Sequence, residues 1–308
     1  MPGMQMQTTI LTTFFGTSRT VVSMCGAGLL LFLVALWAAK TDIARAAGLD
    51  KIAALSNLCF AVPLAVFGAF HLSGVELVLP LVPSYMPWRL FWAYFVGVAL
   101  LSASLSIATK IQVRWSGLLF GIMMFLFVAM LELPGALETP RDRFGWTFVI
   151  REMSFGGGGW ILAGNAMRGQ IGRKLITVGR ALITIAALFY GVEHFLHPAA
   201  CPGVPLEKLM PPWIPGRILI GYLTGAILLA AGGSILLNRK TRIAATYLGT
   251  WILLLVVFVY GPILIAQITD PSTDVKIEGI NYFADTLLFA GAILALAGAT
   301  PRPKSKTA

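Results

Sequence analysis

The stretch VPSYMPWRLFWAYFVGVALLSASLSI at residues 82–107 returns 128 positions later as MPPWIPGRILIGYLTGAILLAAGGSI at residues 210–235. The overlay continues without a gap from residues 82–134 onto residues 210–262. Each copy leads from a proline-rich segment into an apolar run of the length that a membrane-spanning helix needs, about 20 residues. The sequence therefore predicts an internally duplicated helical membrane protein.

The duplication extends in both directions. Upstream, FGAFHL (67–72) aligns with YGVEHF (190–195) after a short insertion in the second copy, which pairs His71 with His194. Downstream, a looser match brings Glu152 near Asp285. Each copy holds four spans, an even number, so both copies enter the membrane from the same side. Their symmetry axis then lies along the membrane normal, as in parallel-repeat transporters.

Composition agrees with a lipid environment. Of the 308 residues, 57% are hydrophobic and 12% are charged, and the mean hydropathy is +0.83. A soluble domain carries roughly 25% charged residues. The alternating pattern of a transmembrane β-barrel is missing. We therefore expect an all-α polytopic bundle of nine spans, made of one extra helix and two parallel four-helix repeats.

The apolar runs divide the chain into spans and domains. Residues 1–50 are expected to form an outside tail and the extra helix, residues 51–170 the first repeat, residues 171–300 the second repeat and residues 301–308 a basic cytoplasmic tail. The nine spans are expected at 21–39, 53–71, 89–109, 115–133, 147–167, 178–195, 217–237, 243–266 and 280–299.

Charge indicates the orientation. The loops 40–51, 110–114, 168–180 and 238–242 and the C-terminal tail hold 15 of the 23 basic residues and two of the 13 acidic ones. By the positive-inside rule this side is cytoplasmic, which leaves the N-terminus outside. A net charge of +10 can indicate nucleic-acid binding, but short basic clusters between apolar runs are typical of membrane topology, so no nucleic-acid partner is expected.

Two sequence features bear on covalent processing: a pattern that suits signal peptidase, and the number and spacing of the cysteines. The first apolar run precedes Ala44-Arg45-Ala46, a pattern that suits signal peptidase. The basic flank of this run and the need for the next span to start inside favour a retained helix. The three cysteines, Cys25, Cys59 and Cys201, form no CxxC pair, and their odd number predicts no disulfide framework.

The motif P-x-[YW]-[MI]-P-x-R occurs at residues 83–89 and again at residues 211–217. Its two prolines forbid a continuous helix, and the second suits a helix start. The closing Arg89 and Arg217 would lie near helix N-termini, where the helix dipole disfavours a cation. An anionic partner would relieve this, either Glu152, Asp285 or an anionic group on a ligand.

Ionisable residues concentrate at the outer ends of the predicted helices. Such groups within a membrane usually face the bundle interior or a wet cavity, which predicts an outward polar vestibule. The alternative is that they reach the headgroup region by snorkelling, and this suits Glu132 and Glu193 best. The set comprises His71, Arg89, Glu132, Arg151, Glu152, Glu193, His194, His197, Arg217 and Asp285.

The histidines and glycines each allow several readings. His71 and His194 suit hydrogen bonding or proton transfer, or a structural role; bis-histidine haem ligation is disfavoured because nothing else marks a haem pocket. A metal site at Glu193, His194, His197 and Cys201 has no counterpart in the first repeat, so no metal is expected. The run GGGG at residues 156–159 suits close helix packing, or room for a flat ligand.

With these motifs in view, the chain resembles the DoxX/DoxD-like family of small bacterial membrane proteins. The resemblance rests on YGVEHFLHP at residues 190–198 and on EKLMPPWIPGRILIGYLTGAILLAAGGSILLNRKTRIAA at residues 207–245. It covers the second repeat well and the first more weakly. It implies a four-helix-bundle fold in a bacterial inner membrane. Some members of this functionally mixed family are linked to quinone-dependent sulfur oxidation or to redox-stress complexes.

The leading hypothesis is a protein that binds a small amphipathic molecule, a quinone or a lipid, near the outer leaflet. The alternatives are a small-molecule transporter or exporter, and a non-catalytic scaffold for a redox partner protein. Membrane lipids are expected partners in every case. The candidate ligand-binding residues are His71, Arg89, Glu152, His194, Arg217 and Asp285.

Overall fold

The computed structural model describes residues 18–301, so the expected outside tail and most of the basic C-terminal tail lie outside the described residues. The described residues form helices and no strand, which confirms the all-α prediction. In chain order the elements are α2 (Arg19–Arg45), α3 (Asp50–Ala53), α4 (Ser56–Ser73), α5 (Val75–Val78), η1 (Leu79–Leu81), α6 (Arg89–Thr109), α7 (Val113–Phe127), η2 (Val128–Glu132), α8 (Leu133–Glu138), α9 (Arg143–Ala166), α10 (Gln170–Leu196), α11 (Arg217–Leu236), α12 (Thr241–Leu255), η3 (Val256–Tyr260), α13 (Gly261–Ile268) and α14 (Thr273–Ala299).

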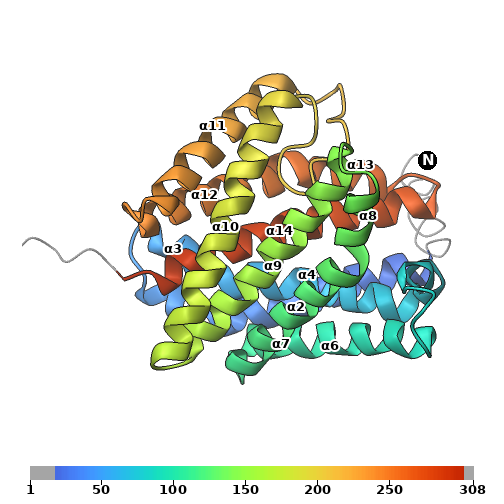
Figure 1. The fold of residues 1–308 in the computed structure, drawn as a ribbon, viewed down its shortest axis with the longest axis horizontal. Helices are drawn as coiled ribbons and strands as arrows, with labels where there is room; N and C mark the ends of the chain where they lie inside the picture. The colour runs from blue at the N-terminus through green and yellow to red at the C-terminus, as the bar shows by residue number, and fades with distance from the viewer. Residues whose placement is uncertain (1–17, 302–308) are drawn as a thin grey trace, which may run out of the picture.

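The long helices form a closed ring. Neighbouring contacts run from α4 to α6, α7, α9, α10, α11, α12 and α14, and α14 returns to α4. Across the ring α9 packs against α14, which divides the bundle into two lobes (Figure 1). We name α4, α6, α7, α9 and α14 the first lobe, and α10, α11, α12, α9 and α14 the second lobe. The extra helix α2 packs outside the ring against α4 and α6.

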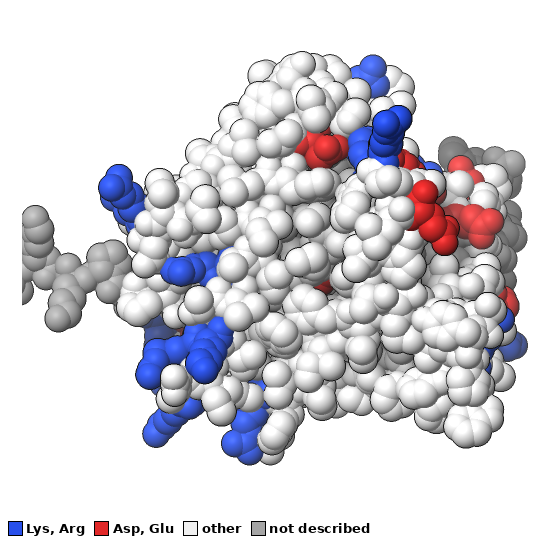
Figure 2. Space-filling view, in the orientation of Figure 1, with Lys and Arg blue, Asp and Glu red and all other residues white. Residues whose placement is uncertain are grey.

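The outer surface of the ring is apolar, and charge lies at its two ends. Exposed leucines, phenylalanines and tryptophans cover α2, α6, α7, α11 and α12. Figure 2 shows a broad uncharged band, with lysines and arginines gathered at one end and most visible acidic side chains toward the other. An apolar belt between charged ends is the surface that lipid requires. The chain is therefore a polytopic helical membrane protein.

The predicted number of nine spans was not exact. Among the described residues, eight helices are long and apolar enough to cross a membrane, and α9 is not one of them. At 24 residues it is about 36 Å long. It packs against α7, α10 and α14, with Phe60 of α4 close to Gly158, so most of its residues are buried. An internal position is compatible with the charged residues and four consecutive glycines of α9.

Local conformation repeats at the same 128-residue interval as the sequence. Left-handed backbone begins α6 at Trp88 and α11 at Gly216, with φ of 53° and 67°. The turns after these helices repeat it at Lys110 and Asn238, with φ of 62° and 52°. The duplication therefore specifies backbone turns as well as helices. The domain boundaries drawn from it remain a prediction.

Each half also contains one π-helical turn at the equivalent place, η2 and η3. Both turns come directly before a helix that has proline near its start, Pro134 in α8 and Pro262 in α13. Proline has no N–H and its ring clashes with the carbonyl four residues earlier, and a widened turn relieves both problems. The last residues of the two turns, Glu132 and Tyr260, thereby take equivalent positions in the two lobes.

Candidate functional site

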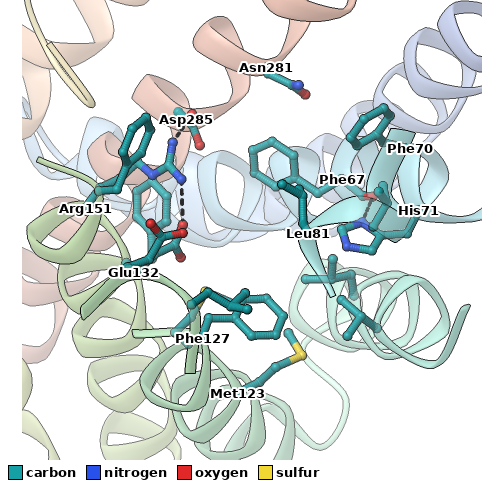
Figure 3. A pocket seen from close by; sticks show the side chains of 18 of the residues that line it. Phe67, Phe70, His71, Leu81, Met123, Phe127, Glu132, Arg151, Asn281 and Asp285 are labelled. Carbon is teal, nitrogen blue, oxygen red and sulfur yellow. Dashed lines mark hydrogen bonds and ion pairs between the residues drawn. The ribbon is translucent and has the colours of Figure 1, made fainter. Parts of the chain in front are cut away.

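The first lobe encloses a cavity of about 750 Å³. Its walls come from α4, α6, α7, η2, α9 and α14, and the segment 77–86 between α4 and α6 covers one end. Pro205 and Glu207, from the connection between α10 and α11, also line it. Aromatic rings dominate the lining, and Figure 3 shows several of them around the space. They belong to Phe67, Phe70, Trp92, Phe95, Phe120, Phe127, Phe148, Phe155 and Tyr282.

A buried ion-pair cluster lies on the wall formed by α9 and α14. The guanidinium of Arg151 donates to Oε1 of Glu152 at 2.8 Å and to Oδ2 of Asp285 at 3.1 Å (Figure 3). The three side chains are between 11% and 16% exposed, so solvent screens their attraction little. The cluster joins the fourth helix of one half to the fourth helix of the other.

Two further polar groups reach this wall without a hydrogen bond from the described residues. Glu132, at the end of η2, lines the cavity near the cluster and forms no ion pair within residues 18–301. The buried Oδ1 of Asn281 also lacks a hydrogen-bond partner there. With Glu152, Asp285 and Arg151, Glu132 gives the wall an excess of acidic over basic groups.

His71 lies on the opposite side of the cavity, at the end of α4 (Figure 3). Its Nδ1 lies 2.9 Å from the carbonyl oxygen of Phe67. A carbonyl oxygen can only accept, so Nδ1 is the donor. In a neutral imidazole the other nitrogen, Nε2, is then an acceptor.

The second lobe is filled where the first lobe is hollow. Residues 200–206, in the connection between α10 and α11, are all buried, and we name this segment the plug. The N–H of Gly203 donates to Nε2 of His194 at 3.2 Å, and Thr286 donates to the carbonyl of Val204 at 3.3 Å. Gly203 also lies against Tyr260, the counterpart of Glu132. The plug thus contacts the equivalents of two residues that line the first-lobe cavity.

The plug is held at its ends as well. Cys201 donates its N–H to Lys208 at 2.7 Å, and Met210 donates to Ala199 at 2.9 Å, which closes the loop on itself. Arg143 of α9 donates to the carbonyl of Leu206 at 3.0 Å. Burial in this loop raises the pKa of the Cys201 thiol to about 12.

The two motif arginines have a structural partner that the sequence did not indicate. Arg89 donates to the carbonyls of Val82 and Leu79 at 2.9 and 2.8 Å, and Arg217 donates to the carbonyl of Met210 at 3.2 Å. Both arginines therefore tie the preceding segment to its helix, and neither lines the cavity. Backbone carbonyl oxygens accept hydrogen bonds from both guanidinium groups, and neither group pairs with a carboxylate among the described residues.

The structure thus brings together three of the six predicted site residues, His71, Glu152 and Asp285, on one cavity. His194 belongs to the second lobe and is covered by the plug. Arg151 and Glu132 belong to the ionisable residues expected at the outer helix ends, but neither is among the six candidate site residues. The sequence did contain a signal for Glu132. The 128-residue shift aligns it with Tyr260, and each of the two residues lies two positions before a repeat-related proline, Pro134 or Pro262.

The four glycines of α9 serve packing. A Cβ atom at any of residues 156–159 would approach side chains of α7, α10 or α14 to between 2.5 and 3.2 Å. None of the four lines the cavity, so they make no room for a flat ligand there. Within residues 18–301, no group of three or more His, Cys, Asp or Glu side chains is arranged to hold a metal ion.

Comparison of the chain with family models, with curated proteins and with solved structures gave no match.

Proposed function

We propose that this chain is a DoxX-like protein of a bacterial inner membrane that binds a small amphipathic molecule, a quinone or a lipid, in the first-lobe cavity. The observation that carries the proposal is the combination of an aromatic cavity with a few convergent polar groups. Ligand pockets have volumes of about 300–1,000 Å³ and this same division between apolar walls and sparse polar contacts. The cavity volume of about 750 Å³ lies in that range.

The polar groups suit a ligand with an apolar body and an oxygen-bearing ring or headgroup. In a redox-linked version, His71 would hydrogen-bond the ligand oxygen, and a carboxylate such as Glu132 would accept or release a proton. The side chain of Glu132 lines the cavity and has no ion pair among the described residues, which supports this role. The expected orientation puts these groups toward the outer leaflet, with the N-terminus outside and the C-terminus cytoplasmic.

The test is a pair of matched substitutions on α6. Val96 lines the cavity, whereas Val98 is 55% exposed on the outer surface of the same helix. Val96→Phe adds a ring to the cavity, and Val98→Phe adds the same ring on the lipid side. Binding is measured in detergent micelles by thermal shift and by quenching of the intrinsic tryptophan fluorescence with short-chain ubiquinone and menaquinone analogues and with phospholipid.

We expect at least one of these compounds to bind the wild type and Val98→Phe equally, and to bind Val96→Phe at least tenfold more weakly. If no quinone or phospholipid shifts the melting temperature of the wild type, the proposal is wrong. Equal binding to both variants would show that the molecule binds elsewhere on the protein.

A further inference from the structure

The contact between the plug and His194 indicates what kind of group the repeat-related His71 can bind. In the second lobe both ring nitrogens of His194 are engaged: Nδ1 lies 2.6 Å from the carbonyl oxygen of Tyr190, and Nε2 lies 3.2 Å from the N–H of Gly203. The carbonyl can only accept and the N–H can only donate. These two contacts together define a neutral imidazole whose Nε2 accepts a hydrogen bond.

His71 repeats the first of these contacts and leaves the second open. Its Nδ1 is bonded to the carbonyl four residues earlier, as in His194, so the two rings share one tautomer. No described residue bonds to its Nε2, and the side chain lines the cavity. A molecule in the first lobe would therefore meet His71 where Gly203 meets His194.

Two other polar groups that lack partners on this cavity are also acceptors. A carboxylate such as Glu132 accepts when ionised, and the unpartnered atom of Asn281 is its carbonyl oxygen Oδ1. The buried Nε of Arg151 is an unpartnered donor on the same cavity. A ligand carbonyl could therefore accept from Arg151, but it would oppose lone pair to lone pair at His71, Glu132 and Asn281. A ligand hydroxyl can donate to any of them.

We propose that the first-lobe site selects an aromatic hydroxyl compound, a phenol or hydroquinone with an apolar tail, whose hydroxyl donates to Nε2 of His71. The inference rests on the proposed function and deepens it: of a quinone pair, the reduced form is the ligand. The aromatic walls suit the ring, because offset and edge-to-face contacts add to the burial of apolar area. The plug takes the place of this molecule in the second lobe through its backbone N–H.

The test compares three ligands with the same short prenyl tail on the wild-type protein in nanodiscs. They are the hydroquinone kept reduced with dithionite, the quinone under air, and the hydroquinone dimethyl ether, which keeps the shape and cannot donate. We expect the hydroquinone to bind about tenfold more tightly than either, the effect of one buried hydrogen bond. A prenylated ammonium compound of similar size tests whether negative charge dominates instead.

Variants locate the preference at His71. His71→Leu should remove the tenfold preference, and His71→Gln, whose amide oxygen accepts, should retain part of it. His197→Leu is the control, because His197 is a 42% exposed side chain outside the cavity. The ligand comparison on the wild type remains decisive even if a His71 variant fails to fold.

The outcomes separate this inference from the proposed function. If all three neutral ligands bind equally and compete with one another, the cavity binds amphipathic molecules and the donor preference is wrong. If the ammonium compound binds more tightly than the hydroquinone, recognition by charge replaces recognition by a hydroxyl. If none of these compounds binds, the quinone form of the proposed function fails and only its phospholipid form is left.

Discussion

Arg151 holds the two halves of the molecule together at the level of single side chains. It bonds a neighbour on its own helix, Glu152, and a residue of the last helix, Asp285, and all three are nearly buried. Removing one member of a buried ion pair leaves the other charge buried and uncompensated. This lowers stability more than replacing the whole pair by apolar residues does. The cluster is therefore the most sensitive polar feature of the described residues.

Arg151→Met should lower the free energy of unfolding by about 3–5 kcal/mol, because two buried carboxylates would then face each other without a cation. The measurement is denaturation in mixed micelles, followed by circular dichroism. Adding Glu152→Gln and Asp285→Asn to the same protein should recover most of the loss by removing the charges.

Arg141→Met is the matched control, since Arg141 is exposed at the start of the same region. We expect a change within about 0.5 kcal/mol for it, as for most surface substitutions. If Arg151→Met and Arg141→Met behave alike, the ion-pair cluster does not stabilise the fold.

At this scale the sequence predicted residue types better than their partners. The repeat alignment found His71, Glu152 and Asp285, because intramembrane charge and histidine are rare enough to stand out. It did not predict the partners of Arg89 and Arg217, because these partners are backbone carbonyls seven to ten residues earlier, in the short helix η1 and in the connections before α6 and α11. Such carbonyls have no signature in the sequence.

At the scale of elements, the plug is an unusual connecting segment because it is buried. Connecting segments usually run over the surface, because buried irregular backbone leaves polar groups unpaired. Here Gly203 and Val204 find partners in His194 and Thr286. Gly203 has a φ of +126°, and a Cβ atom there would lie 3.0 Å from the side chain of Thr286. A residue with a side chain is therefore strained at this position for two reasons.

Gly203→Ala should displace the plug and expose Cys201. In the wild type, burial raises the pKa of Cys201 to about 12, so its thiolate is scarce and maleimide labelling stays slow from pH 7 to pH 9. In the variant the pKa should fall toward the value of a free thiol, and labelling at pH 8 should accelerate at least tenfold. Mass mapping of the labelled peptide separates Cys201 from Cys25 and Cys59.

Gly216→Ala is the control, because Gly216 also has a positive φ but no atom lies within 4 Å of an added Cβ. It should strain the backbone without moving the plug. Equal acceleration of labelling in both variants would mean that Gly203 does not hold the plug in place.

The breaks between helices could be predicted from the sequence, but the burial of the plug could not. Paired prolines predicted breaks in the helices, and the structure adds a π-helical turn before Pro134 and Pro262. In the sequence the plug is only an uncharged stretch, ACPGVPL at residues 200–206, in the region where the second copy is five residues longer than the first (128 − 123). Its burial depends on the space left between α10, α14 and η3, which only the packed structure defines.

In the whole molecule the two halves interlock. The first helix of one half packs against the last helix of the other along both seams, α4 with α14 and α9 with α10. Alternating access by rocking requires two halves that move as separate bodies. The transporter and scaffold hypotheses stay predictions.

The same arrangement explains the error in the number of spans. Hydropathy reports contact with lipid, and α9 is enclosed by other helices, so its glycines and charges are compatible with its place inside the bundle. Fold class and repeat followed from apolar length and self-similarity alone. The asymmetry between a hollow first lobe and a filled second lobe did not, since it arises from a single loop.

The most direct test of the central claim is native mass spectrometry of protein released from membrane nanodiscs without added ligand. We predict that the wild type and Val98→Phe carry one apolar molecule of a few hundred daltons, and that Val96→Phe, with a ring added inside the cavity, retains much less of it. Wild type and Val96→Phe that are both bare, or that retain the same molecule to the same extent, would contradict a ligand site in the first lobe.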